Sequence, residues 1–254
     1  EVGPLEARPA FVTGRQTLDE ALRRAAGWLE ENQVDGTFGL GLPGWSGPEP
    51  GITALCLSAG IWTYDHLGQA RPGWIDQGLD YLVGLQRDNG AIYETGLAVY
   101  TTSVAIEALL DGGRPEDGPV VERARRFLLT AQADEGEGYT PDVDPHYGGI
   151  GYGGDERPDL SNTQMALEAV VRAGLPEDHP LYEKVMVFLE RCQNLGELGA
   201  DEWPRAAGGT LVRGTDGGAT YMPGNSPAGE DALGDDVFSA RSYGSMTYSL
   251  TKSY

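Results

Sequence analysis

The chain has 254 residues, of which 40% are hydrophobic and 22% are charged, and it carries a formal net charge of −21 at pH 7. This composition can bury a sizeable core and excludes a disordered chain, while the charge repels phosphates and anionic lipid heads and so disfavours nucleic acid as a partner. No apolar run approaches the roughly 18–20 residues that span a bilayer. The two cysteines, Cys56 and Cys192, form no metal or redox motif, and no cofactor is expected.

A repeating pair of helices dominates the sequence after a polar extension at residues 1–16. The first predicted helix begins at Thr17 with the capping box TLDE and ends near Gln33. An apolar segment after Pro50 predicts a second helix that stops at Gly68. The same alternation recurs to residue 254, so residues 17–254 are predicted to form one repeat domain. We expect an all-α fold of eight helices in four hairpins, with no strands.

The two helices of each predicted pair differ in composition. The first members carry charges, among them Arg23, Arg123 and Glu183, and are typical of outer helices with one face in water. The second members are almost uncharged and rich in small residues. This pattern predicts an inner layer that is buried on most sides.

Each second helix has a threonine near its start, at Thr53, Thr102, Thr163 and Thr247. The simplest interpretation is that the hydroxyl caps or bonds back to the first helical turn. The alternative is functional: the starts of the inner helices surround one mouth of a central cavity, where their positive dipole ends converge on a ligand. In that case the four threonines are ligand-binding residues.

Two insertions, residues 134–158 and 194–233, interrupt the repeat. Loops of this length in a compact array are usually functional or mobile. Both connect a first helix to the next second helix, so we expect them at the same end as the threonines, over the mouth of the cavity. Tyr147 and Tyr152, in the glycine-rich part of the first insertion, are candidate residues of that mouth.

The ends of the first helices carry a recurring pattern, in which an aromatic and a leucine precede a Gln and then a Gly. The copies are Trp28-Leu29-Gln33-Gly36-Phe38, Tyr81-Leu82-Gln86-Gly90, Phe127-Leu128-Gln132-Gly136 and Phe188-Leu189-Gln193-Gly196. This pattern resembles the QW motif of the terpenoid cyclases and the repeat of protein prenyltransferase β-subunits. The resemblance implies an α/α toroid in which the Gln ties each outer helix to the following turn. It also implies six hairpins in a complete ring, so hairpins outside this sequence or a partner protein would complete the four predicted here.

The resemblance also identifies a candidate catalytic position. The class II cyclases donate a proton from the middle Asp of a D-x-D-D-T motif, and the similar stretch here is Asp159-Leu160-Ser161-Asn162-Thr163. Ser161 stands at the proton-donor position and Asn162 replaces the next acid, which disfavours cyclase activity. Asp159 is typical of a helix N-cap, and Asn162 is a candidate ligand-binding residue. The segment SYGSMTY, which includes Tyr243 and Thr247, resembles a segment of bacterial family members without an assigned reaction; both residues are candidate ligand-binding residues.

A metal site is disfavoured. The prenyltransferases of this family bind zinc through Asp, Cys and His, and the nearest set here, Asp142, Asp144 and His146, lacks a cysteine and fits no standard spacing. We expect a solvated acidic loop at these residues.

Two functional hypotheses remain from the sequence. The first is a non-catalytic binding or assembly module, acting as a structural subunit or holding an apolar isoprenoid or lipid ligand in its cavity. The alternative is a cyclase- or prenyltransferase-like enzyme that uses Asp142, Asp144 or Asp159 as an unusual acid. Because the sequence begins at Glu1, it is either a fragment or a chain that has lost a signal peptide. We favour an exported location.

Overall fold

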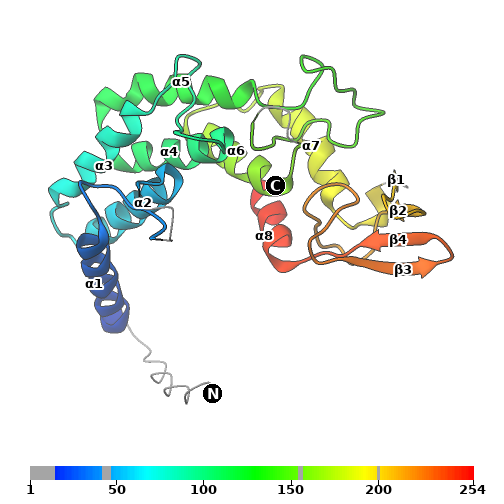
Figure 1. The fold of residues 1–254 in the computed structure, drawn as a ribbon, viewed down its shortest axis with the longest axis horizontal. Coiled ribbons are helices and arrows are strands. Elements are labelled where there is room, and N and C mark those ends of the chain that lie inside the picture. Colours follow the sequence, from blue (N-terminus) through cyan, green and yellow to red (C-terminus); the bar gives the residue numbers. More distant parts are fainter. Residues whose placement is uncertain (1–14, 42–46, 154–156, 199–200) are drawn as a thin grey trace.

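The computed structural model describes residues 15–41, 47–153, 157–198 and 201–254, and within them eight α-helices and one small sheet (Figure 1). The helices are α1 (Arg15–Asn32), α2 (Pro50–His66), α3 (Gly73–Gly84), α4 (Ala98–Gly112), α5 (Gly118–Leu129), α6 (Leu160–Arg172), α7 (Leu181–Cys192) and α8 (Gly244–Ser253). Short 3-10 turns form η1 (Pro115–Asp117) and η2 (Gly196–Leu198). The first fourteen residues of the predicted extension lie outside the described part.

The helices alternate between two layers that follow an open arc (Figure 1). The even-numbered helices contact one another in succession, from α2 through α4 and α6 to α8, and form the inner layer. α3 packs against both α2 and α4, and α5 packs against both α4 and α6. The mostly helical fold and the alternation were therefore predictable from the sequence. A closed toroid of complete hairpins stays a prediction.

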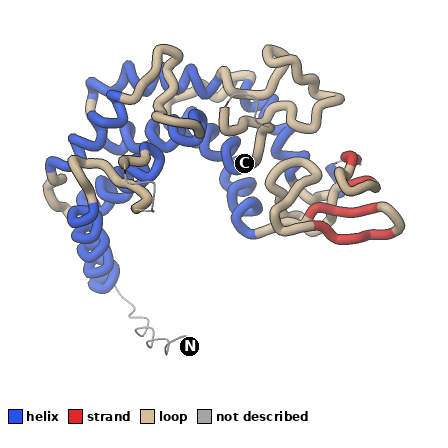
Figure 2. Tube along the Cα trace, viewed as in Figure 1, coloured by secondary structure: helices blue, strands red, loops and turns tan. Residues whose placement is uncertain are grey.

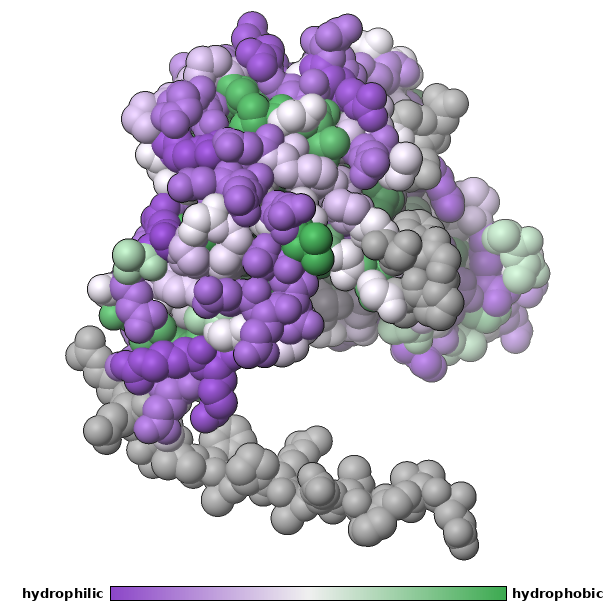
Figure 3. Space-filling view, turned by 60° about the vertical axis from the view of Figure 1, so that its left-hand side comes forward, coloured by the Kyte–Doolittle hydropathy of each residue, from purple (hydrophilic) through white to green (hydrophobic). Residues whose placement is uncertain are grey.

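Small side chains allow the inner helices to approach closely. Ala105, Ala108, Ala166 and Ala169 are fully buried, and a buried alanine fills little of the space between two backbones. The outer surface is mostly hydrophilic on the face shown in Figure 3, with small hydrophobic patches. Across the described residues, no helix combines the length and apolarity needed to cross a membrane.

The prediction of an all-α fold without strands was wrong. Four short strands lie between α7 and α8 (Figure 2): β1 (Glu202–Pro204), β2 (Thr210–Val212), β3 (Glu230–Gly234) and β4 (Val237–Ala240). They pair in the order β1-β2-β4-β3, with β2 parallel to β4 and the other pairs antiparallel. Strands of three to five residues are too short to show an alternating pattern. The predicted 194–233 loop therefore contains β1, β2 and most of β3, and the sheet continues to Ala240.

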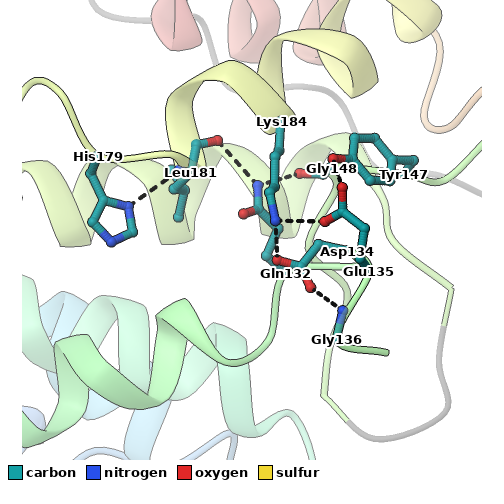
Figure 4. Close-up of polar contacts among 9 residues, drawn as sticks. All are labelled: Gln132, Asp134, Glu135, Gly136, Tyr147, Gly148, His179, Leu181 and Lys184. Carbon is teal, nitrogen blue, oxygen red and sulfur yellow. Dashed lines mark hydrogen bonds and ion pairs between the residues drawn. The ribbon is translucent and has the colours of Figure 1, made fainter. Parts of the chain in front are cut away.

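The capping box at Thr17 was also wrong, because α1 begins at Arg15 and places Thr17 inside its first turn. In the second and third repeats, in contrast, the Gln ties its outer helix to the following turn and to the next outer helix. The Gln86 amide nitrogen donates to the carbonyls of Gly90, in the following turn, and Val120, in the first turn of α5. Gln132 donates in the same way to Gly148 and to Leu181 of α7 (Figure 4).

A glycine in the turn permits this close approach, and in the third repeat it is Gly148 and not the predicted Gly136. Gly36, Gly90 and Gly148 all have positive φ angles, of 78°, 94° and 85°. A Cβ built on any of them would collide with backbone atoms of the next outer helix, α3, α5 or α7 respectively. Each turn is therefore a socket for the helix that follows it, and only glycine fits there.

Gln132→Ala should destabilise the protein by about 2–4 kcal/mol, because two buried carbonyls lose their only side-chain donor. Gln132 is 4% exposed. The matched control is Gln33→Ala, since the Gln33 side chain is half-exposed and bonds only within its own turn, to Gly36 N and Glu30 O. That substitution should cost about 1 kcal/mol or less. Urea unfolding of the three proteins measures the difference, and equal costs would contradict the proposed role of the Gln132 amide.

Candidate functional site

Asp159 forms the N-cap of α6, as its sequence context indicated. Its backbone is extended, with φ −140° and ψ 159°, and its Oδ1 accepts a hydrogen bond from Asn162 N at 2.9 Å. Its Oδ2 accepts a second bond from Asn162 Nδ2 at 2.7 Å. One carboxylate thus satisfies an unpaired backbone donor of the helix and also orients the Asn162 amide.

The Asp159 carboxylate lies in the protein interior. Asp159 and Asn162 are each 1% exposed. Burial raises the pKa of Asp159, and the hydrogen bonds from Asn162 and Tyr221 oppose that rise. Within the described structure, Asn162 Oδ1 is buried without a hydrogen-bond partner. A proton donor must reach its substrate, and a carboxyl group this enclosed can act on one only after a conformational change.

Tyrosines surround this carboxylate. The Tyr152 and Tyr221 hydroxyls lie 3.3 Å apart, and Leu160 N donates to Tyr221 O at 2.8 Å. Burial and the bond to Tyr152 raise the pKa of Tyr221, while burial and the Asp159 charge raise that of Tyr243. The structure therefore places Tyr152 and Tyr243 near Asp159 and Asn162 at the start of α6, and the ligand role of these residues stays a prediction. Tyr221 was missed because no motif marks it within the second insertion.

The four threonines bind backbone groups of the preceding turns. The hydroxyls of Thr53, Thr102 and Thr163 each accept from one backbone N–H and donate to the carbonyl of the same residue, Phe38, Ile92 and Ile150 respectively. These three side chains are fully buried. Thr247 accepts from Ala219 N in the same manner. The contacts join each inner helix to its repeat, and the ligand role of these threonines stays a prediction.

The first insertion is anchored to α7. Lys184 Nζ lies 2.6 Å from Asp134 and 2.7 Å from Glu135, and the Tyr147 hydroxyl donates to Glu135 at 2.8 Å (Figure 4). The two carboxylates raise the pKa of Lys184. Tyr147 is 5% exposed and supports the loop itself.

The candidate metal ligands of this insertion are not gathered around a common point. Asp144 accepts hydrogen bonds from the backbone and hydroxyl of Thr140, Asp142 is exposed, and burial lowers the pKa of the half-buried His146. The described residues include no group of three or more His, Cys, Asp or Glu side chains that could hold a metal ion.

Ion pairs join the inner helices to one another. Arg172 of α6 bonds to Glu107 and Asp111 of α4, and Lys252 of α8 pairs with Glu168 of α6. Burial raises the pKa of Glu107 against the opposing effect of Arg172. These ion pairs link α4, α6 and α8 across the inner layer.

The sequence matches no protein-family model, and no curated protein matches it. Among solved structures, the chain is similar to ent-copalyl diphosphate synthase from Streptomyces platensis, with a TM-score of 0.43 and 18% sequence identity over 63% of this chain. The chain spans 29% of the length of that protein. A likeness at this TM-score carries no weight for the activity of the chain.

Asp159→Asn should be tolerated and should change how stability depends on pH. The folded-state pKa of Asp159 is raised above its unfolded value of about 3.9, so its favourable contribution is present below that pH and is lost as the pH rises through the folded-state pKa. The variant carries no charge, and the unpartnered Asn162 Oδ1 is available to accept from the new amide.

The difference in unfolding free energy, variant minus wild type, should therefore become more positive between pH 4 and pH 7. Urea unfolding across this range measures it. Asp142→Asn removes an exposed carboxylate and serves as the control. A difference that falls with increasing pH would contradict the role assigned to the buried Asp159 carboxylate.

Proposed function

We propose that this chain is a non-catalytic assembly module that receives a helical hairpin of a partner protein on the free side of its first hairpin, α1–α2. One observation carries the proposal: positions that are buried in the later repeats are exposed in the first. The later repeats are covered there by the repeat before them, and the first repeat has no such neighbour among the described residues.

The inner helices provide the first half of this observation. Leu55 and Ala59 follow Thr53 as Val104 and Ala108 follow Thr102 in α4. Leu55 is 46% exposed and Ala59 is exposed, whereas Val104 is 3% and Ala108 is 0% exposed. α4 has α2 on one side and α6 on the other. α2 has α4 on one side only, so its other side leaves an apolar face in water.

The outer helices provide the second half. Ala21 and Ala25 of α1 are exposed. At the same distances before the repeat Gln, the other outer helices have buried residues: Trp74 and Gly78 in α3, Val120 and Ala124 in α5, and Leu181 and Val185 in α7. These residues meet the glycine turn of the preceding repeat, as the packing of Trp74 on Phe38 illustrates, with ring centroids 5.8 Å apart. α1 has the equivalent surface at Ala21 and Ala25, but no glycine turn of a preceding repeat packs on it in the described structure.

The exposed side chains form one continuous stripe on each helix. Leu18, Ala21, Ala25 and Trp28 share one face of α1 by helical spacing, and Leu55, Ala59 and Trp62 share one face of α2. Leu18, Trp28 and Trp62 are 47%, 58% and 55% exposed. Apolar side chains gathered on adjacent helices are typical of an interaction site.

The exposed side of α1 and α2 favours a helical hairpin with a glycine turn as the binding element of the partner. In repeats two to four, the equivalent positions are covered by the hairpin and glycine turn of the preceding repeat. A second copy of this chain would bring a further formal charge of −21 to the interface. We therefore expect a different protein, with a neutral or basic docking surface.

The cyclase-like alternative has less support from the described structure. Ser161 stands where the family has its proton donor, and the nearby Asp159 carboxylate is enclosed and serves as a helix cap. A channel that delivers an apolar substrate to the buried Asp159 would be needed.

Ala25→Arg and Ala59→Arg should abolish partner binding without unfolding the chain. Both alanines are exposed, so each substitution should change stability by about 0.5 kcal/mol or less, whereas an arginine cannot fit where backbones pack closely. The tagged chain is expressed in its native cells, captured proteins are identified, and each candidate is purified and titrated against the wild type. We expect at least roughly tenfold weaker binding by both variants.

The matched control is Ala207→Arg, at an exposed alanine between β1 and β2. It should bind the partner like the wild type, and hydrogen exchange in the complex should slow in α1 and α2. Equal affinity of all three variants, or protection elsewhere in the chain, would contradict the proposed docking side.

A further inference from the structure

A hollow between the starts of α2 and α4 has no role in the assembly function. Its volume is about 580 Å³, and its walls include Pro50, Ile52, Leu97 and Tyr100. Most of this lining is apolar or aromatic. A pocket with apolar walls and a few converging polar groups is the usual form of a small-molecule site.

Two carboxylates line the same hollow. Glu49 caps α2 by accepting from Ile52 N through one oxygen, and Glu94 precedes α4 in an exposed turn. In the described part of the chain, neither carboxylate forms an ion pair. The half-buried Glu107, in contrast, has Arg172 beside it. The hollow therefore has negative charge to offer to a ligand.

Aromatic groups lie next to these charges. A Cβ placed on Gly51 would lie 2.9 Å from the Tyr100 ring and 3.3 Å from the Glu49 carboxylate, so the two groups border the same small space. Burial and the charges of Glu94 and Glu49 raise the pKa of Tyr81 to about 12. The Tyr81 hydroxyl is buried without a partner in the described structure.

Leu97 is held at the rim of the hollow in a strained backbone conformation. Its φ and ψ angles are 47° and 38°, in the left-handed region that non-glycine residues rarely adopt, and it directly precedes α4. Its side chain is nevertheless 47% exposed and lines the hollow. Backbone strain that places an apolar side chain in water is typical of binding sites rather than of the core.

We infer that this hollow binds an organic ammonium ion that carries an alkyl chain. The alkyl chain would lie against Ile52 and Leu97, and the ammonium group would lie between the two carboxylates near the face of Tyr100. A cation gains from both the carboxylates and the ring face. An anion is repelled by Glu49 and Glu94, and a neutral molecule gains only the apolar contact.

The test is a calorimetric titration of the full chain with octyltrimethylammonium chloride, below the concentration at which it forms micelles. Octanoate and octyl glucoside, which have the same alkyl length, are the comparison ligands. We expect saturable binding of one ammonium ion per chain, and at least roughly tenfold weaker binding of the other two ligands. Equal binding of the three ligands, or no saturable binding of the ammonium ion, would overturn the assignment.

The double variant Glu49→Gln/Glu94→Gln should weaken ammonium binding by about tenfold, because both negative charges of the hollow are lost. The amide introduced in place of Glu49 keeps an oxygen that can accept from Ile52 N. The matched control is Glu177→Gln/Asp178→Asn, which makes the same change in net charge at an exposed turn far from the hollow along the chain. If both double variants bind alike, the effect belongs to the overall charge and the assignment fails.

The single variant Glu94→Gln tests the site even if the double variant fails to fold. It should fold normally, since Glu94 is exposed and its side chain makes no described hydrogen bond. It should weaken ammonium binding and leave octyl glucoside binding unchanged. Unchanged ammonium binding in this variant would remove Glu94 from the site.

Discussion

The double hydrogen bond of a glutamine side chain determines how the repeats of this protein are joined. The amide nitrogens of Gln86 and Gln132 each reach one carbonyl in their own turn and one carbonyl in the next outer helix. Such a bond is effective only where the backbones come close, which is why each turn also needs a glycine with a positive φ. In these two repeats the side chain and the glycine together set the position of the following outer helix. The inner layer, the threonine contacts and the anchoring of the first insertion all depend on that position.

Part of this joint could be predicted because it lies in local sequence. The aromatic, leucine and Gln recur at a fixed short spacing four times in the chain. The glycine was predicted less well, because in the third repeat the joining residue is Gly148, sixteen residues after Gln132, and not Gly136. Asp159 could be identified as a helix cap for a similar reason, since capping depends on neighbours a few residues away. The outer helices carry more charged residues than the inner helices. This difference can be read from each helical segment alone, so the two layers could also be predicted without the fold.

The features that the sequence did not reveal depend on contacts between distant segments. The β2–β4 pair joins strands that are separated by most of the second insertion, and each strand is too short for an alternating pattern. Tyr221 lies at the start of α6, where its carbonyl accepts a hydrogen bond from Leu160 N. No motif near Tyr221 in the sequence predicts this contact. The burial of Asp159 likewise comes from the second insertion folding over α6. Each case needs the tertiary structure, because the interacting residues share no local pattern.

The direction of the joint has a consequence for how the chain is made. Each glycine turn receives the helix that comes after it, so a repeat is completed only by residues that leave the ribosome later. The turn at Gly36 packs against α3, the turn at Gly90 against α5 and the turn at Gly148 against α7. During synthesis, each of these three turns stays unfilled until the outer helix that packs on it has left the ribosome. A pause in translation after a glycine turn, and before the next outer helix is made, would leave that turn exposed to chaperones.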